Sequence, residues 1–175
     1  MDQTRLSTAR EGQHVFTNGT NLKGLAIRAT DGDLGTVDQF YFDDETWAIR
    51  YLVVETGGWL GGRQVLISPF SVGRTDWEDK RLDVKLTKKQ VENSPNIDTH
   101  QPVSRQHEAA YLGYYGYPYY WDGPYLWGPQ YYPMGLVAPF ATPEDLLADR
   151  IQRESADSHL RSTEAVTGYS IEAAE

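Results

Sequence analysis

Few residues in this chain have the type and spacing that enzymatic chemistry requires. The four histidines (His14, His100, His107 and His159) are too scattered to form a local pair of metal ligands, and no HExxH or GxSxG motif occurs. The absence of cysteine excludes a thiolate nucleophile and thiolate metal ligands. Among 25 acidic residues no particular carboxylate pair stands out. We therefore expect no enzymatic activity, no cofactor and no metal site.

Two acidic turns could bind a cation. Asp31 and Asp33 flank Gly32 as in a calcium loop, but the twelfth position counted from Asp31 is Phe42 rather than the required Glu. The pattern therefore favours a hairpin turn. Residues 43–45 are also acidic, and we expect a solvated turn in which Asp43 caps backbone amides.

A glycine-rich loop, residues 57–62, follows an expected strand as a phosphate-binding loop would. It lacks the Lys-Ser/Thr pair of such loops and leads into another strand instead of a helix. Two interpretations remain. The loop is a mobile hairpin tip that presents Trp59 and Leu60 to a protein partner, or Trp59 folds back over the end of the sheet.

Alternating apolar residues separated by turn signals predict five or six short strands. The expected strands are Leu22–Ala29, Thr36–Phe42, Trp47–Glu55, Arg63–Ser68, Val72–Trp77 and Arg81–Leu86. Strict alternation places Val37 and Tyr41 on one face of their strand, and Arg50 on the face of Leu52. The strand at 47–55 is apolar on both faces except for Arg50, which predicts a central position. Thr87 is expected to cap a short helix over residues 88–93. Strands at this spacing are typical of a small all-β barrel or sandwich.

The pattern of strand residues and of the turn residues between them resembles one family. The run Gly24-x-x-Ile27-x-Ala29-x-Asp31-Gly32-x-x-Gly35-x-Val37 is followed by Phe42-Asp43-Asp44-x-x-Trp47-x-Ile49-x-Tyr51-x-Val53, and then by Gly61 and Val65-Leu66-Ile67-Ser68-Pro69. This is similar to the PRC-barrel domain, which is found in the cytoplasmic part of the photosynthetic reaction centre and in a ribosome maturation factor. The resemblance covers residues 20–95. It implies a six-stranded β-barrel that binds other macromolecules and has no general catalytic motif.

Composition divides the chain into four parts. We expect a flexible arm at 1–19, the PRC-type barrel at 20–95, a Tyr/Trp/Gly/Pro-rich linker at 96–141 and an acidic, partly helical tail at 142–175. Thr142-Pro143 has the features of a helix start. Residues 159–175 echo residues 14–31, with Gly, Ile and Ala at matching spacing. Our hypothesis is that this segment begins a second barrel repeat and is loosely held or borrowed by another barrel edge.

The most unusual segment is the aromatic tract at 111–135, which holds nine Tyr, two Trp, four Pro and five Gly. Gly and Pro oppose a long helix, so we expect irregular or polyproline-like structure. The tract is either a linker that wraps against the barrel or a dedicated strip for protein binding or self-association. The candidate contact residues in it are Tyr114, Tyr115, Tyr117, Tyr119, Tyr120 and Trp121.

The net charge of −9 argues against nucleic-acid binding, which depends on neutralising phosphates. The N-terminus lacks the apolar core of a signal peptide, and no apolar run is long enough to span a membrane, so we expect a cytoplasmic protein. Contact with a membrane complex from its periphery stays open.

The sequence thus favours a non-catalytic protein-binding or assembly module, with reaction-centre electron transfer as a setting suggested by the resemblance. One alternative is a ribosome-associated factor, supported by a basic group (Lys80, Arg81, Lys85, Lys88 and Lys89). Another is a small-ligand or metal sensor.

Overall fold

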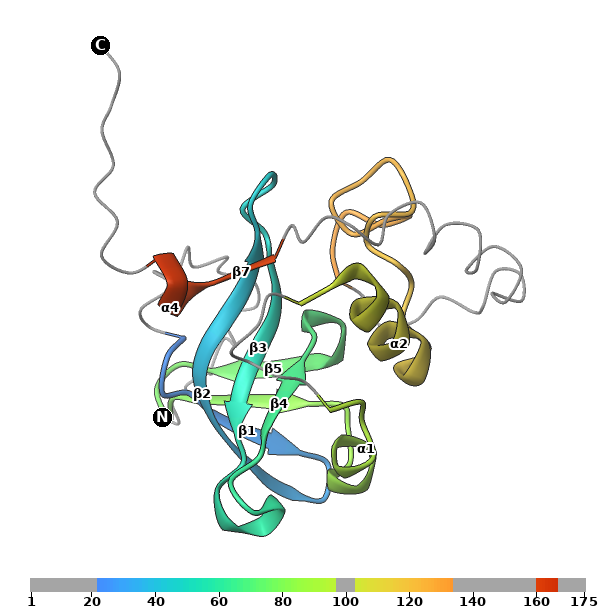
Figure 1. The fold of residues 1–175 in the computed structure, drawn as a ribbon. Helices are drawn as coiled ribbons and strands as arrows, with labels where there is room; N and C mark the ends of the chain where they lie inside the picture. The colour runs from blue at the N-terminus through green and yellow to red at the C-terminus, as the bar shows by residue number, and fades with distance from the viewer. Residues whose placement is uncertain (1–21, 97–102, 134–159, 167–175) are drawn as a thin grey trace, which may run out of the picture.

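The computed structural model describes residues 22–96, 103–133 and 160–166, and the fold is mainly β (Figure 1). A mixed sheet holds β1 (Ala26–Ala29), β2 (Gly32–Asp43), β3 (Ile49–Glu55), β4 (Gln64–Ile67), β5 (Val72–Asp76) and β6 (Arg81–Val84). The short helices are η2 (Gly57–Leu60), η3 (Pro69–Ser71), α1 (Lys88–Glu92), α2 (Arg105–Tyr115) and α4 (Thr163–Val166). A further strand, β7 (Leu160–Ser162), pairs with β2.

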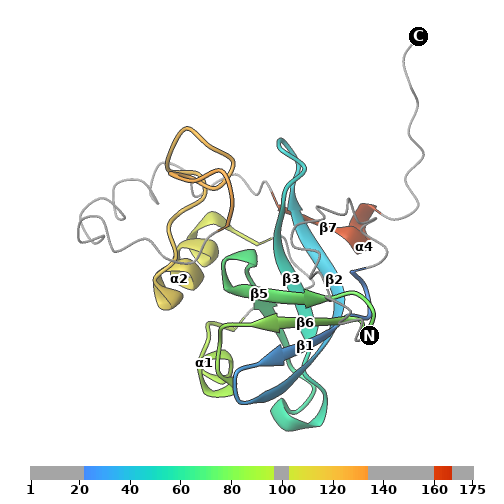
Figure 2. The ribbon, with the colours of Figure 1, turned by 180° about the vertical axis from the view of Figure 1, so that it is seen from behind.

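The sheet follows the order β4-β3-β2-β1-β6-β5. All neighbours on this path are antiparallel except β1 and β6, which run parallel (Figure 2). The six predicted strands are therefore confirmed, and β3 is an interior strand as predicted, because it pairs with β2 on one side and with β4 on the other. The path ends at β4 and β5, and within the described residues no ladder joins these two strands, so the sheet is not seen to close into a barrel.

The predicted turns and caps are also confirmed, but the prediction of a solvated turn is wrong for Asp43, which is buried because it pairs with the buried Arg50 guanidinium. Asp43 Oδ1 accepts hydrogen bonds from the backbone amides of Glu45 and Thr46, at 3.1 and 2.9 Å. Thr87 caps α1 in a capping box with Gln90. Asp31 Oδ1 accepts a hydrogen bond from the Lys88 amide at 2.8 Å, which ties the β1–β2 turn to the start of the helix.

Both faces of the sheet are covered, by two separate groups of buried side chains. The first lies on the face of Leu52 and Val54 and draws buried residues from β1, β2, β3, β4 and β6, with the partly buried Val72 of β5 packed against it. The second lies on the opposite face, where Tyr51 and Val53 meet α2 and the loop that follows it.

Two β-bulges between β2 and β3 correct the predicted faces. The register shifts between Val37 and Gln39, so Val37 joins the first group while Tyr41 joins the second. A second shift follows Tyr41, where Tyr41 pairs with Tyr51 and Phe42 pairs with Ile49, which leaves Arg50 as the extra residue. Strict alternation fails here because each bulge inserts one residue into one strand.

The prediction of irregular or polyproline-like structure is wrong for residues 111–115, because they form the last part of α2. The Ser104 side chain caps the start of this helix by accepting from the His107 amide, and Gly116 ends it with φ 68°. Gly113 is the only helix-breaking residue inside it, and one glycine costs a helix about 1 kcal/mol. The remainder of the tract, to Pro133, is irregular as predicted. The predicted helix at 142–154 lies outside the described residues.

Gly35 lies where β2 passes the end of β3. Its φ is 150°, and a Cβ there would overlap the backbone carbonyl of Glu55. We expect Gly35→Ala to lower the free energy of unfolding by about 3 kcal/mol, from overpacking and strain together. Gly58→Ala is the control, because a Cβ at Gly58 meets nothing within 4 Å. Urea unfolding of both variants checks this, and equal midpoints would contradict it.

Candidate protein-binding surface

Helix α2 is fixed to the sheet by tyrosine hydroxyls. The Tyr111 hydroxyl donates to the Leu66 carbonyl at 2.9 Å and accepts from the Ser68 amide at 3.1 Å. The Tyr114 hydroxyl donates to the Gln90 carbonyl at 2.9 Å, which links α2 to α1. The helix thereby covers β4 and places the start of the aromatic loop, residues 116–133, against the second buried group (Figure 1).

The aromatic loop packs onto this group with two buried rings, Tyr120 and Trp127. The Phe70 ring of η3 meets the Trp127 ring edge-on, with 5.2 Å between centroids, and stacks on the Tyr117 ring, with 5.4 Å between centroids. Gly128 adopts φ 73°, and a Cβ there would overlap the Tyr119 carbonyl, so the loop closes tightly on itself. The loop is thus anchored from within the chain and is not a free linker.

Arg50 holds the β2–β3 turn together from the bulge. Its side chain is buried, and Nη2 lies 3.1 Å from Asp43 Oδ2 and 3.2 Å from Thr46 Oγ1. The bulge aims this side chain at the face of the second buried group, where a regular strand would have pointed it at the first.

The same guanidinium reaches the aromatic loop. Nη1 donates to the Leu126 carbonyl at 2.6 Å, a contact between residues 76 positions apart. The Arg50 Cζ lies 3.9 Å from the Tyr120 ring centroid and 4.9 Å from that of Trp127. One buried cation therefore joins the hairpin turn to the loop through an ion pair, hydrogen bonds and two cation–π contacts.

The environment of Asp43 keeps it charged. Burial by itself raises the pKa of its carboxyl, but the Thr46 amide and the Arg50 guanidinium outweigh burial and lower it below the usual range. The ion pair with Arg50 is therefore intact at neutral pH.

A second buried carboxylate lies on α2. Glu108 Oε1 accepts from the Tyr120 hydroxyl at 2.6 Å, and Oε2 lies 3.2 Å from Arg105 Nη1. Burial raises the pKa of Glu108 to about 7, although Arg105 and the Tyr120 hydrogen bond act in the opposite direction. The Arg105 guanidinium also lies 4.2 Å from the Trp121 ring centroid, so this pair fixes the base of the aromatic loop.

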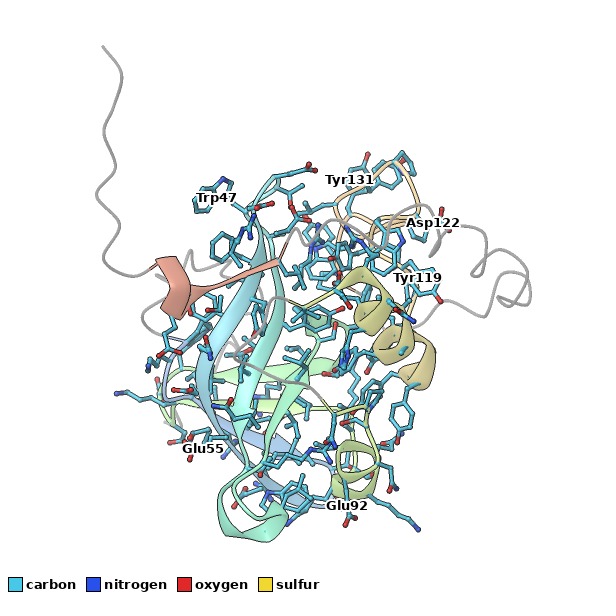
Figure 3. All side chains as sticks on the ribbon, in the orientation of Figure 1. Trp47, Glu55, Glu92, Tyr119, Asp122 and Tyr131 are labelled. Atoms are coloured by element: carbon cyan, nitrogen blue, oxygen red, sulfur yellow. The ribbon has the colours of Figure 1, made fainter. Side chains whose placement is uncertain are left out.

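Above this buried anchor, large apolar side chains are exposed at one end of the molecule. We call these residues the aromatic end: Trp47, Tyr125, Leu126, Tyr131 and Tyr132. Trp47 lies in the β2–β3 turn and Tyr131 in the aromatic loop, and Figure 3 shows both at the same end. Thr46 directly precedes Trp47, and Leu126 is itself part of the aromatic end. Both residues contact the Arg50 guanidinium, so the β2–β3 turn and the aromatic loop are held side by side.

The comparison with protein families decides the identity of the sheet region. Residues 15–91 match the model of the PRC-barrel domain. This part of the chain is a PRC-barrel domain. The domain is typically non-catalytic. The resemblance seen in the strand and turn pattern is thereby confirmed.

The similarity to one relative covers more residues than the match to the PRC-barrel domain. The chain is 35% identical over 106 residues to an uncharacterized protein of Deinococcus radiodurans, an alignment that covers 58% of this chain and 38% of that protein. The chain thus spans well under half of that relative's length. Among the described residues, no helix has the length and apolar character needed to cross a membrane.

The predicted contact residues of the glycine-rich loop pack against the first buried group of the same domain. The loop forms η2, and the Trp59 Nε1–H donates to the Leu34 carbonyl at 2.6 Å while Lys88 Nζ lies 4.4 Å from the ring centroid. Trp59 and Leu60 are half-buried against the first group. Of the two interpretations, the structure shows the one in which Trp59 folds back.

The predicted contact residues of the tract differ in exposure. Tyr120 is buried by its own chain, and Tyr115, Tyr117, Tyr119 and Trp121 are half-buried against the second group. Tyr114 is 43% exposed, although its hydroxyl is used by Gln90. A role for these six in partner binding stays a prediction.

Sequence reasoning missed Trp47, the most exposed large apolar side chain among the described residues, because it placed this residue within a strand. Trp47 instead lies in the turn with φ 57°, and its indole is 73% exposed and stacked on Phe42 at 5.2 Å. It also missed Glu108 and Arg105. Arg50, the lone charge on an apolar strand face, was the available signal for a buried ionic partner.

The Arg50 anchor predicts a large effect on stability. Arg50→Met leaves Asp43 buried without its cation, so we expect the free energy of unfolding to fall by about 3–5 kcal/mol. The control is Lys23→Met, which breaks the exposed Lys23–Asp38 pair and should cost under about 1 kcal/mol. Urea unfolding measures both. Adding Asp43→Asn to Arg50→Met should recover part of the loss, and a loss below about 1 kcal/mol for Arg50→Met would contradict the anchor.

The raised pKa of Glu108 predicts a pH dependence. Between the ordinary pKa of 4.5 and the native value of about 7, the native state holds more protons than the unfolded state. The contribution of Glu108 to the free energy of unfolding should therefore fall by about 3 kcal/mol as the pH rises through that window. Burial lowers the pKa of His107, which gives an opposite slope in every variant.

The difference between wild type and Glu108→Gln isolates the contribution of Glu108. Unfolding midpoints in urea from pH 5 to pH 8 should fall more steeply for wild type than for Glu108→Gln. Glu92→Gln, at an exposed position, is the matched control and should follow wild type. Parallel curves for wild type and Glu108→Gln would refute the assignment.

Proposed function

We propose that this chain is a non-catalytic protein-binding module and that the aromatic end is its contact surface. The observation that carries the proposal is Trp47, which is held in a left-handed backbone conformation with its indole 73% exposed. That conformation costs a bulky residue about 1–2 kcal/mol, and Gly or Asn would adopt it more easily. Strain retained together with exposure of an apolar ring is a feature of functional sites.

The aromatic end has the composition of an interface centre. Tyr and Trp are enriched at the cores of protein interfaces because they offer large contact area at low entropic cost. The rings are also ordered by one another: Tyr125 and Tyr131 lie 3.9 Å apart between centroids, and Trp47 stacks on Phe42. A surface that is already ordered loses little entropy when it binds.

Three acidic residues and one basic residue, Arg161, lie around this surface. Asp44 and Glu45 belong to the same turn as Trp47, and Asp122 lies on the aromatic loop (Figure 3). Asp44 makes an ion pair with Arg161, with 2.9 Å between Oδ2 and Nε. An aromatic centre with an acidic rim favours a protein partner whose contact face is apolar at the centre and basic around it. It disfavours a polyphosphate backbone.

The narrower proposals differ in support. The family relation to the photosynthetic reaction centre makes electron-transfer complexes one class of partner to test. The ribosomal alternative rests on the basic group at 80–89, but there Arg81 is shared by Asp76, Asp79 and Asp83. Lys88 lies over the Trp59 ring. We therefore place RNA binding second. No observation on the described residues favours a ligand or metal sensor.

Substitutions at the aromatic end should separate binding from stability. Trp47→Gly relieves the backbone strain and loses the contact with Phe42, so its free energy of unfolding should stay within about 1 kcal/mol of wild type. Tyr131→Ser with Tyr132→Ser removes two exposed rings. The control is Trp77→Ser, which removes a 43% exposed indole from the turn between β5 and β6.

The measurement is quantitative affinity capture on the full chain, followed by titration of the purified partner. We expect at least a tenfold weaker Kd for Trp47→Gly and for the double tyrosine variant, and an unchanged Kd for Trp77→Ser. Equal affinity for all four proteins would contradict the proposed surface. Capture of RNA that weakens with salt would favour the alternative instead.

A further inference from the structure

The long strand β2 takes two different partners along one edge. β3 pairs with β2 from Thr36 to Phe42, so β1 and β7 must share the opposite edge. β1 pairs with the first part of that edge, up to Thr36, and β7 pairs with Tyr41–Asp43 (Figures 1 and 2). The second part of the edge is therefore occupied by a strand from far along the chain.

The contacts with β7 define what this edge accepts. Leu160 pairs with Asp43 and is 1% exposed among the second buried group. Arg161 pairs with Phe42 and makes its ion pair with Asp44 at 2.9 Å. Beyond the strand, Thr163 Oγ1 accepts a hydrogen bond from the Phe40 amide at 3.3 Å. The edge thus takes a short strand with a buried apolar first residue and with hydroxyl residues at the third and fourth positions.

A three-residue strand is weakly held. Such a strand forms few ladder hydrogen bonds, and Leu160 is its only buried side chain. Short edge elements with few buried contacts open at low free energy. β7 can therefore leave this edge while the rest of the sheet stays folded.

The chain contains a second segment of the same pattern. His14-Val15-Phe16-Thr17 parallels His159-Leu160-Arg161-Ser162, with an apolar residue after His and a hydroxyl two residues later. The match to the PRC-barrel domain begins at residue 15, so this segment belongs by sequence to the same domain as β2.

The chain direction and length would let this second segment reach the same edge. The Gly24 amide donates to the Val37 carbonyl at 2.7 Å, so the chain before β1 already borders β2 four positions from Tyr41. Four positions on a strand are about 13 Å, and the seven steps from residue 17 to residue 24 span up to about 23 Å. An antiparallel strand with Val15 opposite Asp43 and Thr17 opposite Tyr41 would run toward Val37, in the direction of Gly24.

We propose that the Phe40–Asp43 edge of β2 is a strand-acceptor site for which two segments of this chain compete. Leu160–Thr163 occupies it in the structure, and Val15–Thr17 takes it when β7 leaves. Binding of the first segment releases the second, so the site works as an exchange point between the two ends of the domain. This inference concerns a different surface from the aromatic end and does not depend on it.

The test is hydrogen exchange in the full chain of the Phe40 and Phe42 amides, which face the β7 edge because amides alternate along an antiparallel strand. Leu160→Asp should expel β7, because burying an unpaired carboxylate at that position is unfavourable. We expect Leu160→Asp alone and Val15→Asp alone each to leave these amides within about threefold of wild-type protection. The double variant should lose at least tenfold. The amides of Val53 and Val54 report whether the sheet is still folded.

Two outcomes would overturn the proposal. Loss of protection with Leu160→Asp alone, equal to that of the double variant, would show that Val15–Thr17 does not bind. Retained protection in the double variant would show another occupant.

Disulfide trapping gives a second readout, since the chain has no native cysteine. Phe42→Cys should form an intrachain disulfide with Phe16→Cys and, in a separate variant, with Arg161→Cys. A Thr20→Cys control, out of register, should react more slowly. Interchain disulfides alone would assign the site to a second copy and contradict the proposal.

Discussion

The buried guanidinium of Arg50 is the interaction on which the arrangement of the candidate surface depends. A cation in this position needs compensation for lost hydration, and it obtains it from Asp43, from the Leu126 carbonyl and from two aromatic rings. These partners belong to the β2–β3 turn and to the aromatic loop. The need to compensate the charge of Arg50 therefore holds these two segments together. The exposed rings that they carry are thereby placed at the same end of the molecule.

Much of the PRC-barrel domain could be predicted from the sequence because its strands obey local rules. Turn residues such as Asp43 and the Thr87 cap act within a few positions, and the six strands lie where alternation and punctuation place them. The surface could not be predicted in the same way. Two bulges change which face a side chain occupies, and nothing local to Arg50 reveals that its partner is a carbonyl 76 positions away. The interior tyrosines of the tract were candidates for binding, yet their burial depends on α2.

Aromatic residues of the same types, Tyr and Trp, have two different roles in the structure. Rings such as Tyr111, Tyr120 and Trp127 fix the helix and the loop to the sheet, and their polar groups or faces are used inside the chain. Trp47 and the exposed tyrosines lie outside this packing. The acceptor edge of β2 is a third feature, bounded by Asp43 at one end, so the same turn takes part in the Arg50 anchor and in strand exchange.

The most direct test of the central claim is a hydrogen-exchange footprint of the full chain with and without its purified protein partner. If the aromatic end is the contact surface, amide exchange should slow in residues 44–48 and 124–132 on binding, while the β5–β6 turn at 77–80 stays unchanged. Protection confined to the β5–β6 turn, to α1 or to the glycine-rich loop would contradict the account.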